Sequence, residues 1–173
     1  MNYMVDIETL GDTPRAVVTS IAVMDIDNPS SFVHITGINV EEQLRQGAMV
    51  NGDTLNWWSK QPPELFKQQL ASDTSLDEAM NAVCNFLPKY FNTIWAKGDS
   101  FDLPILRFMF NSRSDNPFKW WGKYRDFRTI SKLYPNKELL PARTGDAHNA
   151  LSDCQYQTEW LVNIRKAHGL ELK

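Results

Sequence analysis

The sequence contains little cysteine and none of the cysteine patterns that hold a zinc ion or a redox-active pair. Its two cysteines, Cys84 and Cys154, lie far apart in the chain and form no CxxC motif. We interpret them as free thiols, buried or exposed, in a reducing compartment. A zinc knuckle and a disulfide-exchange site are therefore both disfavoured.

Long hydrophobic runs and targeting patterns are also missing. No apolar stretch approaches the roughly 20 residues that cross a membrane. Residues 1–6 show no basic segment followed by a long apolar run, which is the pattern of a secretory signal. We expect a soluble, cytoplasmic protein with no membrane partner.

A surplus of basic residues is absent as well, since the net charge is −3. This balance disfavours a protein that coats duplex nucleic acid by charge alone. It is compatible with an enzyme that handles one strand end, because carboxylates that hold metal ions make such a site acidic.

The overall composition is that of a globular protein. Of the 173 residues, 42% are hydrophobic and 12% are aromatic, and both values are typical of folded chains. No repeat, low-complexity tract or linker divides the sequence. We therefore predict a single domain over residues 1–173.

The order of the predicted elements indicates an α/β or α+β fold. Residues 3–7, 17–26 and 31–38 have the apolar, β-branched pattern of strands, and the turn signal at residues 27–30 predicts a hairpin between the last two. A shorter strand is expected at residues 93–96. Helical patterns occupy residues 54–60, 64–70, 76–87 and a long segment within 146–168. This order predicts a mixed central sheet flanked by helices.

Helix ends are marked by capping residues. Thr74 or Ser75 is a suitable N-cap for the helix over residues 76–87. Ser100 or Asp99 can cap a helix that continues through residues 103–110. Gly169 is expected to end the last helix.

Asp6 and Glu8 stand two positions apart on the first predicted strand, so both side chains point to one face of the sheet. The other face, with Tyr3, Val5 and Ile7, can be core. Two neighbouring carboxylates repel each other, and a divalent cation relieves that repulsion. Oxygen ligands suit Mg²⁺ or Mn²⁺. Two ordinary acids at a solvent-facing strand edge are the alternative, and the pair alone leaves both open.

A second acid, Asp102, follows a short strand and lies in or near the first turn of the next helix. The helix dipole favours an acid there, so a capping role is one interpretation. The other is a site residue, because helix starts that follow strands lie at the sheet edge where sites are built.

His148 and Asp153 form the third candidate group. On one continuous helix they would be separated by about 140° and could not face one site. If Asn149 is the N-cap, His148 lies in the preceding loop and Asp153 projects from the second turn of the helix. A histidine beside a metal cluster is suited to act as a general base. A polar helix start without chemistry is the alternative.

These three groups, in this order, resemble the three exonuclease motifs of the DEDD superfamily, the RNase H-like 3′→5′ exonucleases. The matching residues are 6–9, 100–102 and the pair His148 and Asp153. The histidine marks the DEDDh branch, whereas Asn149 stands where the DEDDy branch has a tyrosine. The resemblance spans nearly the whole chain.

Within that branch, further segments resemble one small phage and bacterial group. Residues 54–58, with their double tryptophan, and residues 125–129 are similar to the group typified by the phage T4 exonuclease DexA and the mycobacterial Rv2179c-like exoribonucleases. Proofreading subunits lack the double-tryptophan segment.

The resemblance implies an RNase H-like fold and a metal-dependent exonuclease. It would release 5′ mononucleotides from the 3′ end of single-stranded DNA or of 3′ overhangs. Asp6, Glu8, Asp102 and Asp153 would hold two divalent ions, Mg²⁺ or Mn²⁺, and His148 would accept the proton of the attacking water. A homodimer is left open.

Fewer sequence features identify substrate contacts than identify the catalytic residues. The resemblance places the terminal nucleotide near Thr9 and Leu10, and Phe101 is a candidate either for stacking on a base or for core packing. Trp57 and Trp58 would point about 100° apart on a helix, so at most one faces a substrate, and we expect both to pack.

Basic residues and one further acid complete the candidates. Asp126 is expected to be structural, paired with Arg125 or Arg128. The residues that either contact phosphates or form a solvated face are Lys97, Arg107, Lys119, Lys123, Arg125 and Arg143.

Three alternative functions stay in view. An exoribonuclease is one, because no residue pattern identifies a reader of the 2′-hydroxyl. A catalytically silent nucleic-acid-binding module is another, although all five expected catalytic residues are present. The third, a metal- or small-molecule-binding protein unrelated to nucleic acid, predicts a closed apolar pocket instead of an open acidic groove.

Overall fold

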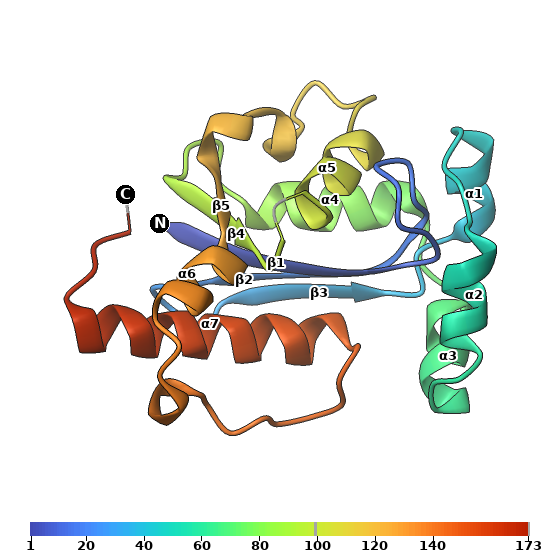
Figure 1. The fold of residues 1–173 in the computed structure, drawn as a ribbon. Coiled ribbons are helices and arrows are strands. Elements are labelled where there is room, and N and C mark those ends of the chain that lie inside the picture. The colour runs from blue at the N-terminus through green and yellow to red at the C-terminus, as the bar shows by residue number, and fades with distance from the viewer. Residues whose placement is uncertain (99, 173) are drawn as a thin grey trace.

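A mixed sheet with helices on both faces organises the chain (Figure 1). The structure, a computed structural model, describes residues 1–98 and 100–172. Within these residues five strands pair in the order β3-β2-β1-β4-β5. Their bounds are β1 Asn2–Thr9, β2 Val18–Asp25, β3 Phe32–Thr36, β4 Thr93–Ala96 and β5 Tyr124–Asp126.

The first three strands form an antiparallel meander, and the last two add in parallel. β1 pairs with β2, and β2 with β3, in antiparallel register, which confirms the predicted hairpin. β4 lies parallel to β1 and to β5. The carboxyl ends of β1, β4 and β5 therefore meet at one edge of the sheet, where α/β folds build their sites.

Helices cover both faces of the sheet. In Figure 1, α4 and α5 lie above it and α7 lies below it, while α1, α2 and α3 stand at the end toward which β1 runs. The bounds are α1 Val40–Arg45, α2 Gly52–Trp58, α3 Pro63–Gln69, α4 Leu76–Phe86, α5 Asp102–Met109, α6 Phe127–Leu133 and α7 Ala150–His168. No described helix is both long and apolar enough to cross a membrane.

The alternation of β1 divides the core into two layers. Tyr3, Val5 and Ile7 pack with α4 and α5 in one cluster, as predicted. Met4 points to the other face and joins Cys154 and Leu161 of α7. Asp6 and Glu8 continue the side of Met4, so the acidic pair faces α7.

Helix ends follow the capping expectations in part. Ser75 caps α4 and forms a reciprocal capping box with Glu78. Gly169 ends α7 in the left-handed conformation, with φ of 63°. The expected cap at Ser100 is wrong: Phe101 occupies the N-cap of α5 without a side-chain hydrogen bond, and Asp99 lies outside the described residues. α1 was not predicted from the sequence.

Asp126 has the structural role that was expected, but with other partners. It ends β5 and caps α6, because its carboxylate accepts hydrogen bonds from the backbone N–H groups of Arg128 and Thr129. It also accepts the N–H of Gly98 at 3.0 Å. The Arg128 guanidinium instead donates to the carbonyl of Lys97. The acid thus joins the ends of β4 and β5.

Candidate active site

The C-terminal half of β1 carries two of the predicted acids on one face of the sheet. A bulge between Glu8 and Thr9 changes the pairing with β2 at that point. Asp6 faces α7, where the Nε2 of the buried Gln157 donates a 2.7 Å hydrogen bond to its Oδ1. Glu8 is 9% exposed. Both carboxylates are therefore largely shielded from solvent.

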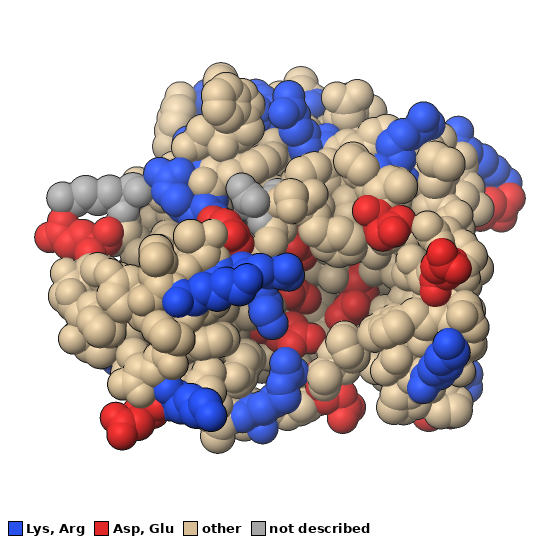
Figure 2. Space-filling model, in the orientation of Figure 1, with Lys and Arg blue, Asp and Glu red and all other residues tan. Residues whose placement is uncertain are grey.

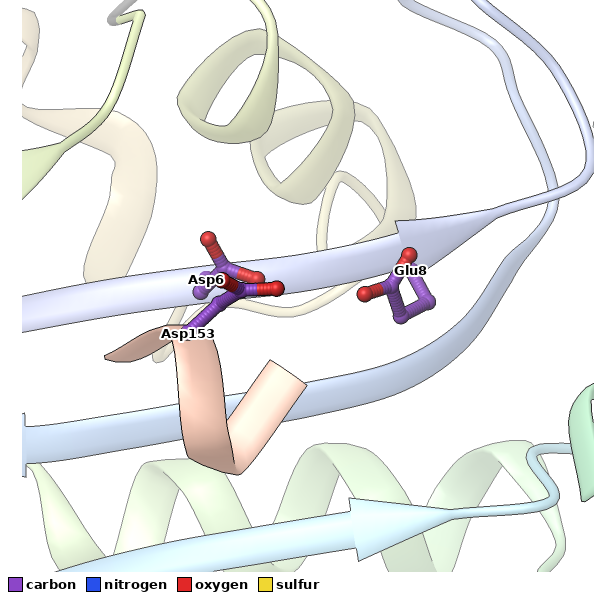
Figure 3. Close-up of side chains that lie close together, drawn as sticks. All are labelled: Asp6, Glu8 and Asp153. Atoms are coloured by element: carbon purple, nitrogen blue, oxygen red, sulfur yellow. The ribbon is translucent and has the colours of Figure 1, made fainter. Parts of the chain in front are cut away.

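The start of α7 brings the third acid to this pair. Asn149 is the N-cap, as predicted, and its side chain accepts the N–H of Ser152. Asp153 then projects from the first turn toward β1. Figure 3 shows the Asp6 and Asp153 carboxylates side by side, with Glu8 farther along the strand. One ligand atom from each of the three residues lies within 4.8 Å of the others.

Asp102 lies beside this group. It is the first residue of α5 and is 5% exposed. Its Oδ1 accepts the backbone N–H of Ile7 at 3.3 Å. Because Ile7 stands between Asp6 and Glu8, this bond fixes the start of α5 against the acidic stretch of β1. The four predicted carboxylates are therefore brought together by β1, α5 and α7.

Burial makes this cluster costly to ionise without a cation. Burial raises the pKa of Asp6 well above its usual range, and the carboxylates of Asp102, Glu8 and Asp153 raise it further. Burial raises the pKa of Glu8 to about 8, with Asp153 and Asp102 contributing. Burial also raises the pKa of Asp102 to about 7 against the lowering effect of its backbone hydrogen bonds. A divalent ion would offset this repulsion.

The donor set fits hard divalent cations. All of the gathered ligand atoms are carboxylate oxygens, which are the ligands that Mg²⁺ and Mn²⁺ prefer and that Zn²⁺ shares with nitrogen and sulfur donors. The nearby Cys154 thiol is buried on α7, and burial raises its pKa well above its usual range. The thiol is thus held neutral beside the acids.

Asp153 already binds two groups of the preceding loop. Its Oδ1 accepts a 2.6 Å hydrogen bond from the guanidinium of Arg143, and its Oδ2 accepts the backbone N–H of His148 at 2.8 Å. The Arg143 guanidinium also lies over the ring of Tyr156, 4.9 Å from its centroid. The loop before α7 is therefore tied to the acidic cluster through Asp153.

His148 lies in this loop, directly before the helix, as predicted. Its φ is 62°, a left-handed conformation in which histidine is enriched among residues other than glycine. The side chain is exposed and packs against Trp57 of α2, with ring centroids 4.6 Å apart and ring planes 86° to each other. A base candidate and an aromatic side chain thus border the acids on the same side.

The two tryptophans have different environments, so the expectation that both pack is wrong for Trp57. Trp58 is 1% exposed, and its Nε1 donates to the carbonyl of Thr9 at 2.8 Å. Trp57 is 39% exposed and meets Trp58 edge to face. The buried ring anchors α2 to the end of β1, and the neighbouring ring is left at the surface beside His148.

A cavity of about 360 Å³ opens beside Glu8. Its walls include Thr9, Phe101 and Trp57. Leu10, the other residue expected at the terminal nucleotide, is 2% exposed and packs with Val17 and Trp58. Its side chain is therefore part of the core.

Gln157 and the loop partner Arg143 were not identified as site-positioning residues from the sequence. Gln157 follows Asp153 by four residues, so the two share one face of α7. This spacing is the sequence signal that could have identified Gln157. Its Oε1 has no hydrogen-bond partner among the described residues. The position of Arg143 had no such signal, because a loop determines it.

The charge distribution suits an acidic site with basic borders. Figure 2 shows acidic side chains at the bottom of a hollow in the middle of this face, with Lys and Arg groups along one border. Electrostatic effects of Arg128 and Lys97 lower the pKa of Asp102 slightly against its rise by burial. An anionic chain can therefore approach along the basic border toward the cations that the acids would hold.

Residues 1–165 match the family described as the 3′-5′ exoribonuclease Rv2179c-like domain. The chain belongs to this exonuclease family. The exonuclease is 28% identical, over an alignment of 210 positions, to the exodeoxyribonuclease of Enterobacteria phage T4. That alignment covers 98% of the chain and 92% of the relative.

Two solved structures share the fold of the exonuclease. One is the nuclease domain of 3′hExo, a DEDDh family member, bound to rAMP, with a TM-score of 0.66 and 12% identity over 96% of this chain and 92% of that one. The other is Exonuclease X in complex with 5′ overhanging duplex DNA, with a TM-score of 0.64 and 14% identity over 99% and 95%. The predicted RNase H-like fold is confirmed by these structures, and the family match identifies the chain as a 3′→5′ exonuclease.

Proposed function

We propose that this exonuclease removes 5′ mononucleotides from the 3′ end of single-stranded DNA, or of 3′ overhangs, with two divalent ions, Mg²⁺ or Mn²⁺. The observation that carries the proposal is the meeting of Asp6, Glu8 and Asp153 within 4.8 Å, with Asp102 hydrogen-bonded to the strand between the first two. Residues 1–173 would act as one catalytic unit.

The four carboxylates of Asp6, Glu8, Asp102 and Asp153 would hold the ions. When bound, such ions activate a water and stabilise the leaving oxygen of a phosphodiester. Gln157 orients Asp6 by its 2.7 Å hydrogen bond. Outer hydrogen bonds of this kind fix the direction of a ligand's lone pairs.

His148 would accept the proton of the attacking water as the general base. Its backbone N–H is held by Asp153 and its ring by Trp57, so two elements position it beside the acids. The proton then leaves through solvent, because the side chain is exposed.

The 360 Å³ cavity would receive the terminal nucleotide. Its volume lies at the small end of the range for ligand sites, about 300–1,000 Å³. Thr9 and Phe101 line it, together with the partly exposed ring of Trp57. The side chain of Leu10 is buried and is not among the proposed contacts.

DNA is our first choice of substrate because the phage T4 relative, aligned over 98% of the chain, is an exodeoxyribonuclease. RNA is the second candidate, since the family description names an exoribonuclease. Hydrolysis of DNA and of RNA would use the same acids, so the preference between the two substrates depends on contacts to the sugar.

The test is to incubate the protein with 5′-labelled single-stranded DNA and with RNA of the same sequence, in Mg²⁺ or Mn²⁺. A ladder that shortens from the 3′ end supports the proposal, and the faster oligonucleotide identifies the substrate. Asp6→Ala should abolish the ladder, and His148→Ala should slow it about 10²–10⁴-fold, the contribution of a positioned general base. Asp77→Ala, at an exposed acid in the first turn of α4, is the matched control. Full activity of Asp6→Ala would overturn the proposal.

A further inference from the structure

Three large aromatic side chains are exposed far from the acidic cluster. Tyr90 is 75% exposed, Trp120 57% and Trp121 72%. Folded proteins seldom leave several such rings together in water, and exposed apolar groups gathered in one place mark interaction sites. With Lys89, Lys119 and Lys123 they form what we name the aromatic–lysine surface.

Each of the three lysines lies near an aromatic ring, Lys89 and Lys119 near exposed rings of this surface and Lys123 near the buried ring of Phe91. The Nζ of Lys89 is 5.4 Å from the ring centroid of Tyr90, and that of Lys119 is 5.3 Å from the ring of Trp120. Lys123 Nζ lies 4.4 Å from the ring of Phe91 and donates a 2.7 Å hydrogen bond to its carbonyl. Two exposed rings of the surface, Tyr90 and Trp120, therefore each have a lysine cation beside them.

A hollow of about 460 Å³ joins the two segments that carry these residues. Residues 87–91 form one wall, and residues 114–120 form the other. The acid on its wall, Asp115, is neutralised by Arg113 at 2.8 Å. The positive charge of the lysines is therefore not offset by that acid, although the chain as a whole carries −3.

The topology places this surface at the opposite sheet edge from the acids. Residues 87–91 lead into the start of β4, and Trp121–Lys123 leads into the start of β5. In Figure 1 these segments lie above and to the left of the sheet. The four residues of β4 alone span roughly 13 Å, at about 3.3 Å per residue, so the path from the acids to this surface is longer than that. A strand of several nucleotides can reach from one to the other.

We infer that the aromatic–lysine surface binds the single-stranded nucleic acid several nucleotides to the 5′ side of the cleaved end. Rings that stack on any base, interleaved with cations that meet phosphates, are the features that bind single strands without sequence preference. The inference rests on the proposed function, because it extends the path of the same substrate.

A second copy of the chain fits this surface less well. A symmetric dimer places the same patch on both partners, so the three lysines of one copy would face those of the other. Polyanionic nucleic acid has the complementary charge.

The first experiment compares long and short substrates. The variant is Trp121→Ala, and the matched control is Phe32→Ala, a 43% exposed ring on the opposite edge strand β3. The substrates are oligothymidylates of 24 and 3 nucleotides and the p-nitrophenyl ester of thymidine 5′-monophosphate. We expect Trp121→Ala to lower kcat/KM about tenfold on the 24-mer, the loss of one stacked base, and to leave the two small substrates unchanged. An equal loss on all three, or no loss on the 24-mer, would overturn the inference.

A binding measurement separates this inference from the catalytic proposal. Fluorescence anisotropy of a labelled 24-mer, in EDTA, reports binding without cleavage. Trp121→Ala and Lys119→Gln should raise Kd, whereas Lys67→Gln, at an exposed lysine of α3, should not. If the wild type cleaves no substrate but these shifts appear, the catalytic proposal fails and the surface stands. If Trp121→Ala instead converts a dimer to a monomer in sedimentation velocity with Kd unchanged, the surface joins two copies and the inference fails.

Discussion

The imidazole of His148 packs edge to face against the indole of Trp57, with ring centroids 4.6 Å apart. The two residues are far apart in the sequence and belong to different elements. Trp57 is itself supported by Trp58, whose buried ring is hydrogen-bonded to the carbonyl of Thr9. A continuous chain of contacts therefore runs from the acidic strand through the double tryptophan to the proposed base.

Trp57→Ala should lower kcat more than it raises KM. Removal of the indole frees the His148 ring, and a base that samples several orientations transfers the proton less often. We expect a loss of about 10-fold or more, since a small misplacement at a catalytic group costs up to about 10²-fold. Trp57→Phe, which keeps an aromatic face, should recover most of the rate.

A proton NMR spectrum tests the same contact without substrate. The chain has three histidines, so the ring protons of His148 can be assigned with His148→Ala. Ring-current displacement of these protons in the wild type should vanish in Trp57→Ala. A rise in KM alone, with the resonances unmoved, would instead make Trp57 a base-stacking residue.

Arg143→Ala should strengthen metal binding. The guanidinium of Arg143 donates a 2.6 Å hydrogen bond to Asp153 Oδ1. An ion that binds this oxygen must therefore displace the guanidinium. Ion pairs that are partly exposed contribute about 0.2–1 kcal/mol, which corresponds to about a 1.4- to fivefold lower Mg²⁺ concentration at half saturation. Melting temperature as a function of Mg²⁺ concentration measures this shift. Arg45→Ala, whose partner is Glu41 on the surface, is the control, and an unchanged midpoint in Arg143→Ala would contradict the displacement.

Gln157→Leu should weaken metal binding and activity about 10- to 100-fold, the usual cost of losing a group that orients a ligand. The substitution keeps the size of the buried side chain but removes the donor to Asp6. Calorimetric titration with Mn²⁺ measures the affinity. Gln157→Glu provides a contrast, since it adds a carboxyl group beside Asp6. A normal Mn²⁺ affinity in Gln157→Leu would show that the hydrogen bond is dispensable.

Stability in EDTA should fall as the pH rises from about 5 to 8. Burial raises the pKa values of Glu8 and Asp102 to about 8 and about 7, from usual values of 4.5 and 3.8. The folded chain therefore binds more protons than the unfolded chain across this window, and unfolding becomes easier as these protons leave. Each kcal/mol lost lowers the melting temperature by about 2–4 °C in a domain of this size.

Saturating Mg²⁺ should flatten this profile, because the cation takes the place of the protons. Glu8→Gln should flatten the EDTA profile too, since an amide does not titrate. Differential scanning fluorimetry at fixed ionic strength gives both curves. Identical slopes for wild type and Glu8→Gln in EDTA would show that the acids do not control stability in this range.

Local patterns predicted much of the fold and most of the site. The alternation along β1 determined that Asp6 and Glu8 share a face, because side chains alternate in any strand. Asn149 determined where α7 begins, and so placed His148 in the loop and Asp153 on the helix. These features depend on neighbours within a few residues, and sequence spacing describes such neighbours well.

Only the tertiary structure decided which residues meet across elements. It buried Trp58 and Leu10 but left Trp57 exposed beside His148, it joined Arg143 to Asp153, and it set Gln157 against Asp6. Sequence patterns alone identified the candidate ligands, their order and the elements that carry them. Their partners depend on how α2, α7 and the loop before α7 pack on the sheet, and that packing is settled by contacts between residues distant in the chain, which local spacing does not describe.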